Sequence, residues 1–547
     1  MSKVSPLEQL QHLIALEQKD IGTLVAYSIG IGLMSLTTPI AVQALVNTIA
    51  FGALLQPLFV LTLILLVLVG FSNSLAGLQF YVVEMLQRRI FVRIFGNAAT
   101  CLQRVSYSQR DQIYLPELAN RFLDVVTLQK TAAVLLLETL GYVLQTLIGM
   151  VLLAFYHPLL LAFDLVLITL LGVILFTLGQ QGLDTAIIQS KAKYKALAWL
   201  ETIATNPVIT KSEYGDAYIH AQTEHIAETY LTACQNHFRI LTRQNIGALI
   251  LHTLASTALL GMGGWMVIEH QLSLGQLIAA ELVVSAMVYG LTRLGKMLDN
   301  YYELLTSLDK INHILDLPQE QSSCAHQNHP TTPYTLNIIS VTMPKSGMAE
   351  HLQAINLRLA AGEHIVINHN RDYSSLFDVV FGLRQPAQGY VCVNEQDIRD
   401  INLRTLRDTI ALVRDAEIIP GSIIDNISLA RTIPPDEIRQ ILHSVGLSSE
   451  LSNLPEGLHT VLSSDGAPLT PEQSLRLTLA RALLLKPRLL LLDGVLDKLK
   501  PDVLDDLFNY LCSQPNHLTL LVNSQQPAII QRFSRQAAII DGQLVET

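Results

Sequence analysis

The stretch IVINHNRDYSSLFD, residues 365–378, lies where a strand is expected to pass into a helix. Nucleotide-binding domains place a phosphate-binding loop of the form G-x-x-x-x-G-K-[ST] at such a junction. That loop binds phosphate because its glycines let backbone N–H groups converge on the oxygens and its lysine adds positive charge. Residues 365–378 contain neither glycine nor lysine. They therefore predict a site without the usual means of binding a nucleotide.

The composition indicates a membrane part and a soluble part. Of the 547 residues, 50% are hydrophobic and 15% are charged, a composition too apolar for an ordinary soluble protein. The chain is also too long for one compact domain. The formal net charge of -10 and the lack of a basic stripe argue against nucleic acid as a partner. Five scattered cysteines without metal-ligand spacing indicate reduced, structural thiols: Cys101, Cys234, Cys324, Cys392 and Cys512.

Six helices long enough to span a bilayer are expected, at residues 21–50, 55–85, 133–156, 159–181, 246–268 and 274–297. Three of their connections are short turns without lysine or arginine, whereas the two long connections are rich in both. By the positive-inside rule, the long connections and both termini are cytoplasmic. Helical periodicity in the long connections predicts that helices continue well past the membrane. Residues 1–20 have leucines at helical spacing, which fits either a surface helix or a fraying leader.

Polar residues inside the expected spans are candidates for a substrate or proton path. Pro39 should kink the first span, and Gln43 and Asn47 follow it on the same helical face. Asp164 and Glu281 are the lone acids of their apolar stretches. The alternative, which we favour, is hydrogen bonding between helices together with snorkelling near a helix end.

From residue 334 onward, short β-rich runs alternate with helical stretches, which predicts an α/β domain around a largely parallel sheet. The runs are TLNIISVTM, HIVIN, YVCVN, TIALV, LLLLD, LTLLVN and AAIID.

Three collinear segments resemble the cassette domain of an ATP-binding cassette (ABC) transporter. They are AQGYVCVNEQDIRDINLRTLRDTIALVRD, GSIIDNISLAR and LTPEQSLRLTLARALLLKPRLLLLD. Together with six spans and two deep inner extensions, they make nearly the whole chain similar to an ABC exporter half-transporter. The stretch YLPELANRFLDVVTLQK is similar to inner loops of exporters for type I secretion and peptide export. The resemblance implies an interfacial segment, a six-helix membrane domain, a linker and a degenerate α/β cassette, at residues 1–20, 21–315, 316–333 and 334–547.

The family's nucleotide motifs are replaced in this sequence. In the phosphate loop, Tyr373 stands at the lysine position and Asp372 at the preceding glycine, followed by Ser374 and Ser375 at the hydroxyl positions. The other differences occur in chain order: Arg414 and Asp415 at the magnesium-sensing glutamine, Leu469-Thr470-Pro471-Glu472-Gln473 at the L-S-G-G-Q signature, Gly494 at the catalytic glutamate after Asp493, and Ser524 at the switch histidine.

The resemblance makes Ser374, Ser375 and Asp493 remnant ATP and magnesium positions. We expect no catalytic residue, no metal and no cofactor, with ATP and magnesium only if residual binding persists, because this hydrolysis depends on positioning and electrostatics that the replaced residues supplied. For Ser374 we favour a second role, as the cap of the following helix.

The predicted function is a membrane transport subunit for peptides, proteins or other amphiphiles, with a cassette that neither binds nor hydrolyses ATP alone. By resemblance it forms a dimer with a competent ABC subunit or with itself, in a bacterial-type inner membrane among lipids. A periplasmic membrane fusion protein is implied as a further partner. One alternative is an ATP-independent scaffold or regulator that uses the exporter fold to hold other proteins. Another is a residual ATPase with rearranged motifs.

Overall fold

The computed structural model describes residues 6–50, 55–111, 113–320, 333–344, 351–368, 374–512 and 518–546. Its contacts divide the chain into two compact units. The helical unit comprises Met1–Arg104 and Tyr114–Leu317, and the cassette unit comprises Val105–Ile113 and Pro318–Thr547. The short segment Val105–Ile113, from the first long connection, thus packs with the cassette. Cys324 lies outside the described residues.

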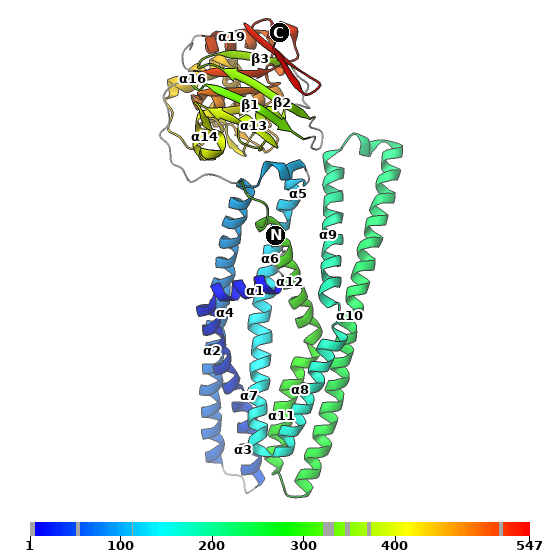
Figure 1. Cartoon of the computed structure of the whole chain (residues 1–547). Helices are drawn as coiled ribbons and strands as arrows, with labels where there is room; N and C mark the ends of the chain where they lie inside the picture. The colour runs from blue at the N-terminus through cyan, green and yellow to red at the C-terminus, as the bar shows by residue number, and fades with distance from the viewer. Residues whose placement is uncertain are drawn as a thin grey trace. The chain divides into compact units, whose positions relative to one another are not determined.

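Long helices make up the helical unit (Figure 1). In chain order they are α1 (Pro6–Leu16), α2 (Gln18–Ser35), α3 (Thr37–Ala50), α4 (Leu55–Gln103), α5 (Leu115–Asn120), α6 (Asp124–Val134), α7 (Leu140–Tyr156), α8 (Pro158–Leu178), α9 (Gly182–Thr205), α10 (Glu213–Ile268), α11 (Leu274–Thr292) and α12 (Leu294–Leu315). A π-helical turn at Leu135–Thr139 joins α6 to α7.

The helices extend beyond a bilayer, as the sequence predicts. Helix α4 has 49 residues and α10 has 56. At about 1.5 Å per residue both are more than twice the roughly 30 Å hydrocarbon thickness. The predicted kink near Pro39 is also confirmed, because the helix breaks at Leu36 between α2 and α3. Proline lacks the N–H that would continue the helical hydrogen bonds across this point.

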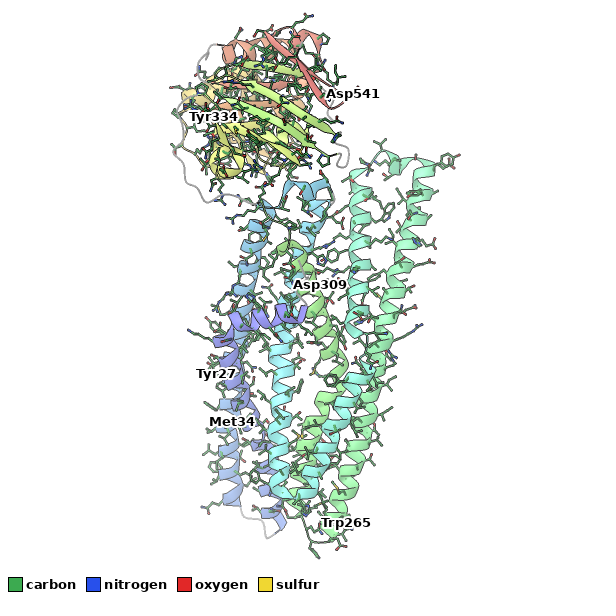
Figure 2. All side chains as sticks on the ribbon, in the orientation of Figure 1. Tyr27, Met34, Trp265, Asp309, Tyr334 and Asp541 are labelled. Carbon is green, nitrogen blue, oxygen red and sulfur yellow. The ribbon has the colours of Figure 1, made fainter. Side chains whose placement is uncertain are left out.

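Five helical runs in the described residues are long and apolar enough to cross a membrane. They are Gln18–Thr48, Leu58–Gln103, Leu115–Tyr156, Pro158–Leu178 and Glu213–Ile268. The sixth predicted span, 274–297, is divided: an apolar stretch at Leu274–Met287 lies in α11, and α12 begins at Leu294. Figure 2 shows Trp265 near the end of α10, and 51% of its surface is exposed, as suits an aromatic ring at a lipid headgroup layer.

Two larger sheets and a two-stranded ribbon form the cassette unit. An antiparallel sheet has the order β2-β1-β4-β5, with β1 (Leu336–Met343), β2 (Leu352–Leu359), β4 (Gln388–Val393) and β5 (Gln396–Asp397). A mainly parallel sheet has the order β12-β11-β3-β10-β9-β6, with β3 (His364–Asn368), β6 (Ile410–Val413), β9 (Leu489–Asp493), β10 (Thr519–Asn523), β11 (Arg535–Ile540) and β12 (Gln543–Glu546). The ribbon pairs β7 (Gly421–Ser422) with β8 (Val461–Leu462).

The parallel sheet is the core that the sequence predicts. The four leucines Leu489–Leu492 in β9 are all 0% exposed, because helices cover both faces of a parallel sheet. The principal helices are α13 (Ser375–Val380), α14 (Leu403–Thr409), α16 (Pro435–Ser444), α18 (Pro471–Leu484) and α19 (Pro501–Cys512). Gly382 follows α13 at φ +71°, the left-handed conformation in which glycine commonly ends a helix. The separate antiparallel sheet is absent from the prediction.

Candidate functional site

Parallel strands bring the candidate residues to one edge of the larger sheet. In the register of β9 with β10, Asp493 lies opposite Asn523. Both are the last residues of their strands, and both are only 2% exposed. The Nδ2 group of Asn523 donates a hydrogen bond of 2.8 Å to Oδ1 of Asp493. The carboxyl ends of parallel strands are the usual place of ligand sites in such folds.

Arg414, one residue beyond β6, occupies the other oxygen of Asp493. Its Nε donates to Oδ2 of Asp493 over 2.5 Å. Its Nη2 donates to Oδ1 of Asp378 over 2.9 Å and to the carbonyl oxygen of Ser374 over 3.1 Å. One guanidinium therefore lies between two buried carboxylates, at the position where the family has a glutamine.

The electrostatics of this pair favour the charged forms. Burial by itself raises the pKa of Asp493, but the charge of Arg414 and hydrogen bonds from Asn523, Ser374 and Arg414 outweigh it and hold the pKa below 3.8. Burial likewise lowers the pKa of Arg414, and the charges of Asp378 and Asp493 raise it above the ordinary range. Both groups are ionised at neutral pH.

A second arginine extends the ion pairs to the segment Val105–Ile113. Arg384 Nε donates to Oδ2 of Asp378 over 2.9 Å. Its Nη1 and Nη2 donate to the two oxygens of Asp111 over 2.6 and 2.8 Å, a bidentate geometry. The guanidinium also lies 5.1 Å from the centre of the Tyr107 ring, within range of a cation–π contact. We call Asp493, Arg414, Asp378, Arg384 and Asp111 the charge network.

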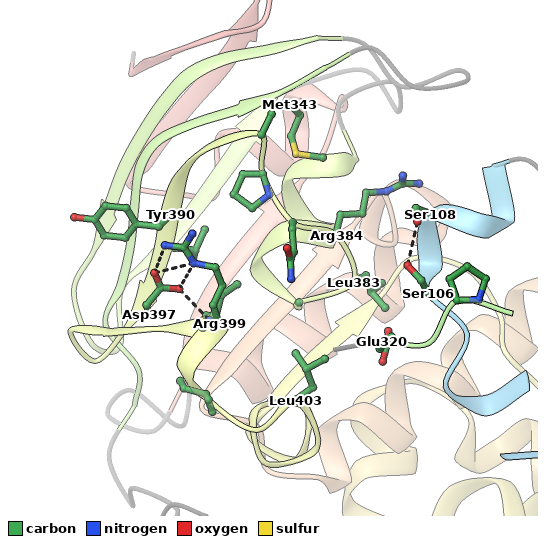
Figure 3. Close-up of a pocket in the computed structure, with 18 of the residues that line it drawn as sticks. Ser106, Ser108, Glu320, Met343, Leu383, Arg384, Tyr390, Asp397, Arg399 and Leu403 are labelled. Carbon is green, nitrogen blue, oxygen red and sulfur yellow. Dashed lines mark hydrogen bonds and ion pairs between the residues drawn. The ribbon is translucent and has the colours of Figure 1, made fainter. Parts of the chain in front are cut away.

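The segment Val105–Ile113 is held by further contacts. Ser106 N–H donates to the carbonyl oxygen of Pro318 over 2.8 Å, and Val105 forms a β-bridge with Gln319. Beside it lies a cavity of about 770 Å³, shown in Figure 3, lined by Ser106, Ser108, Glu320, Met343, Arg384 and Tyr390 among others. The cassette unit thus includes a piece of the long connection as an integral part.

The structure corrects the favoured role of Ser374. Its side chain does not cap α13, and its carbonyl oxygen accepts from Arg414. Ser375 is 4% exposed and its Oγ has no hydrogen-bond partner among the described residues. Asp372 and Tyr373 lie outside the described residues.

At the positions of the sensing glutamine and the switch histidine, Asp415 and Ser524 are hydrogen-bonded within the chain. Gly494 has φ +67°, in the left-handed region. Ser524 Oγ donates to Oδ1 of Asp497 over 2.5 Å. Asp415 accepts from Lys498 Nζ over 2.7 Å. These contacts connect neighbouring loops to one another.

The signature segment forms a self-capped helix end. Thr470 is the N-cap of α18: its Oγ1 accepts from Gln473 N–H over 3.3 Å, and Gln473 Oε1 accepts from Thr470 N–H over 2.8 Å. Pro471 has no N–H at all. The Glu472 carboxylate lies 3.7 Å from Lys500 Nζ and 3.8 Å from Arg476 Nε. Side chains of this chain therefore occupy the backbone N–H donors and the positive dipole end of α18, which a phosphate would need.

The polar candidates in the spans lie on three helices: Gln43 and Asn47 on α3, Asp164 on α8 and Glu281 on α11. Tyr156 donates to Gln43 Oε1 over 2.5 Å, and Asn47 lies against Gly275 at the start of α11. Asp164 is 0% exposed, and neither of its carboxyl oxygens has a partner among the described residues. Glu281 has one buried oxygen, Oε2, without a partner in the same set. Gln43 thus takes part in a hydrogen bond between α3 and α7.

Several site residues have no counterpart in the sequence predictions: Asp378, Arg384, Asp111 and Tyr107. Only Asp378 had a readable signal, because it is an acid within the apolar helical stretch SSLFDVVFGL. The others belong to segments distant along the chain, so their proximity is set by the fold.

Comparisons with known proteins agree with this architecture. Residues 352–496 match the family described as ABC transporter. The chain is 26% identical over 300 residues to the alpha-hemolysin translocation ATP-binding protein HlyB of Proteus vulgaris, covering 52% of this chain and 41% of HlyB. It is 25% identical over 297 residues to the leukotoxin export ATP-binding protein LtxB of Aggregatibacter actinomycetemcomitans, covering 52% and 41%. The matches thus span about two fifths of each relative's length.

A solved structure covers nearly the whole chain. A bacterial Atm1-family ABC exporter with ATP bound has a TM-score of 0.84 and 17% identity, and the match covers 97% of this chain and 95% of that one. At this identity the likeness shows the fold. The predicted resemblance to ABC exporter half-transporters and the predicted fold class are confirmed: a helical membrane domain precedes an α/β cassette, in an integral membrane protein.

Proposed function

We propose that this chain is an exporter-type half-transporter whose cassette neither binds nor hydrolyses ATP by itself. The observation that carries this proposal is the position of Arg414, which donates to Asp493 and Asp378 at once. Asp493 is the remnant magnesium position, and its two oxygens already accept from Arg414 and Asn523. A magnesium nucleotide would have to break these hydrogen bonds and displace a guanidinium of the same charge sign as the metal.

The other residues present do not fit ATP either. Magnesium demands a near-octahedral set of oxygen ligands. Of the remnant positions, Asp493 already accepts from Arg414 and Asn523. The loop sequence supplies no lysine to neutralise the β- and γ-phosphates, and hydrolysis of this kind depends on such charges. The charge network therefore replaces the nucleotide as the group that connects the sheet edge to the segment Val105–Ile113.

The signature segment supports a second candidate function, that of an ATP-independent scaffold or regulator. In the family this segment would face the nucleotide of the opposite subunit. Here Pro471 has no N–H to donate to that nucleotide, and Glu472 adds a negative charge that would repel it. A dimer with a competent ABC subunit would then lack a complete site on either side. Such a dimer could hold a partner complex without using its own ATP sites.

The cellular setting belongs to the same proposal. The chain spans a bacterial-type inner membrane. By the positive-inside rule, both termini and the long connections are on its cytoplasmic side. The chain dimerises through its helices and cassette with a competent ABC subunit or with itself, and a periplasmic membrane fusion protein is a further partner. The similarity to export proteins named HlyB and LtxB supports a peptide, protein or other amphiphile as the cargo.

The deciding experiment is calorimetric titration of the detergent-purified full-length protein with magnesium-ATP up to millimolar concentration. The expected result is no binding heat. Saturable binding that disappears in Asp493→Asn would overturn the proposal, because it would show a working magnesium site. HlyB purified in the same detergent is the positive control for nucleotide binding.

A second measurement separates the two candidate functions. The full-length protein is purified with a competent cassette subunit, and ATP turnover of the complex is compared with that of the subunit alone. Coupled transport predicts a change in turnover on association. A stable complex with unchanged turnover favours the scaffold, and failure to associate at all contradicts the heterodimer.

A further inference from the structure

A polar cavity lies in the helical unit, away from the nucleotide remnant. It has a volume of about 230 Å³ and lies among α6, α9, α10 and α12. Its chemically distinctive lining residues are Asp124, Ser190, Lys193, His237, Asp299 and Glu303. No part of the proposed nucleotide chemistry uses this cavity, so an inference from it goes beyond the proposed function.

The cavity lies outside the hydrocarbon layer. His237 is roughly 45 Å along α10 from the helix end at Ile268, at about 1.5 Å per residue. Asp124 is at the opposite end of the α6–α7 run from Tyr156, at a similar distance along the helix. Because the hydrocarbon core is about 30 Å thick, both residues lie in water-accessible surroundings. Charged solutes can therefore reach the cavity without entering lipid.

Its floor is buried and hydrogen-bonding. Asp124, Ser190 and His237 are 4%, 8% and 5% exposed. His237 Nδ1 shares a hydrogen bond of 3.0 Å with Thr185, which orients the ring, and its Nε2 lies 3.6 Å from Asp299. The Ser190 hydroxyl is buried and has no hydrogen-bond partner among the described residues. Such an unsatisfied group in a native cavity indicates a missing polar occupant.

Its charge is predominantly negative. Lys193 Nζ donates to Asp124 over 3.1 Å, so these two charges compensate each other. Asp299 and Glu303 remain, four residues apart on one face of α12, where like charges repel. No ion pair within 4 Å is found for Glu303 among the described residues, although the charge of Lys193 also acts on it, and Asp299 lies 3.6 Å from His237 Nε2. Both residues are exposed, and both line the cavity.

These features identify the kind of ligand. An anion would face the uncompensated carboxylates. A metal ion is disfavoured, since no group of three or more His, Cys, Asp or Glu in the described residues could hold one. A small organic cation suits both the negative charge and the unpaired hydroxyl of the cavity, because its ammonium protons can donate to carboxylates and hydroxyls together. We infer that the cavity binds a small aliphatic amine, with ammonium groups at Asp299 and Glu303 and hydrogen bonding to Ser190.

The test is calorimetric titration of the detergent-purified full-length protein with 1,4-diaminobutane at low ionic strength. Saturable binding is expected, while 1,4-butanediol and succinate should give none. The double variant Asp299→Asn/Glu303→Gln should weaken binding at least about ten-fold, because it removes the two carboxylates that would contact the ammonium groups. The Ser190→Ala variant should weaken it by a smaller factor of about two to five.

Matched controls make each outcome decisive. Glu228→Gln neutralises an exposed acid on α10 and should leave the affinity unchanged. Thermal unfolding of each variant identifies any that fails to fold. If the double variant does not fold, the affinity of Ser190→Ala, which changes no charge, is the test. No binding by the wild type overturns the inference. Equal binding of the diol, or unchanged affinity in the double variant, overturns it as well. Titration with magnesium-ATP is separate, so failure of one proposal leaves the other standing.

Discussion

Arg414 and Asp493 form a hydrogen-bonded ion pair in which Nε and Oδ2 are 2.5 Å apart. The side chain of Asp493 is 1% exposed and that of Arg414 is 23% exposed. The carboxylate that ends the central strand β9 is therefore neutralised by the chain's own side chain. A resident cation of this kind stabilises the apo fold, because a buried carboxylate without a partner is strongly unfavourable.

Replacing Arg414 should destabilise the sheet edge. Arg414→Gln leaves Asp493 and Asp378 as buried carboxylates without this partner, and such losses cost about 3 to 5 kcal/mol. Hydrogen exchange of the β9 and β10 amides in the full-length protein should accelerate accordingly. Arg404→Gln, at an exposed position on α14, is the control and should have no effect. Unchanged exchange in Arg414→Gln would contradict the role of the charge network.

The Asp111–Arg384 pair should anchor the segment Val105–Ile113. Both side chains are mostly buried, at 23% and 13% exposed, and the bond is bidentate. Asp111→Asn should weaken the anchoring by about 1 kcal/mol, after allowance for partial solvent screening. Amide exchange in this segment should rise while that of β9 stays constant. Asp436→Asn, from a pair exposed at 91% and 74%, should change neither.

The stability of the cassette should depend on pH in one direction. The folded-state pKa of Asp493 lies below its ordinary value of 3.8, so its contribution is present above that value and is lost as pH falls through the folded pKa. Opening free energies of β9, from exchange corrected for intrinsic rates, should be constant between about pH 5 and 8 and fall below about pH 4. In the Asp493→Asn variant, the opening free energies of β9 should fall less below about pH 4. An equal fall in that variant would assign the effect to other carboxyls.

Asp164 should lower the stability of the helical unit. Its carboxyl oxygens have no partner among the described residues, and it is 0% exposed on α8 between Leu160 and Leu167, two members of a buried apolar cluster. Asp164→Leu should stabilise the helical unit by about 1 to 3 kcal/mol, since an unsatisfied buried polar group is removed. Both tryptophans lie in this unit, so their fluorescence reports its thermal unfolding.

Asp164→Asn provides the matched comparison. It keeps an unpartnered polar group of the same size and should give little of the gain. If Asp164→Leu instead lowers the midpoint of unfolding, the carboxyl has a structural partner and the prediction is wrong.

Local pattern was enough to predict much of the fold. The runs HIVIN and LLLLD became β3 and β9 because continuous apolar residues suit strands buried on both faces. The break near Pro39 followed from its missing N–H. The antiparallel sheet was not predicted, because the alternating β2 pairs with β1 through contacts that no local pattern specifies.

Residue types alone determined which of the family's motif residues this sequence replaces. No fold can restore a lysine to the loop at 365–378, a glutamate at Gly494 or an N–H at Pro471, so these absences could be read from the sequence. The tertiary structure decided what takes their place. Arg414 is 36 residues from Asp378 and 79 from Asp493, and Arg384 is 273 from Asp111. The partner of a charge depends on which distant segments the fold brings within hydrogen-bond distance, and residue identity does not contain that distance.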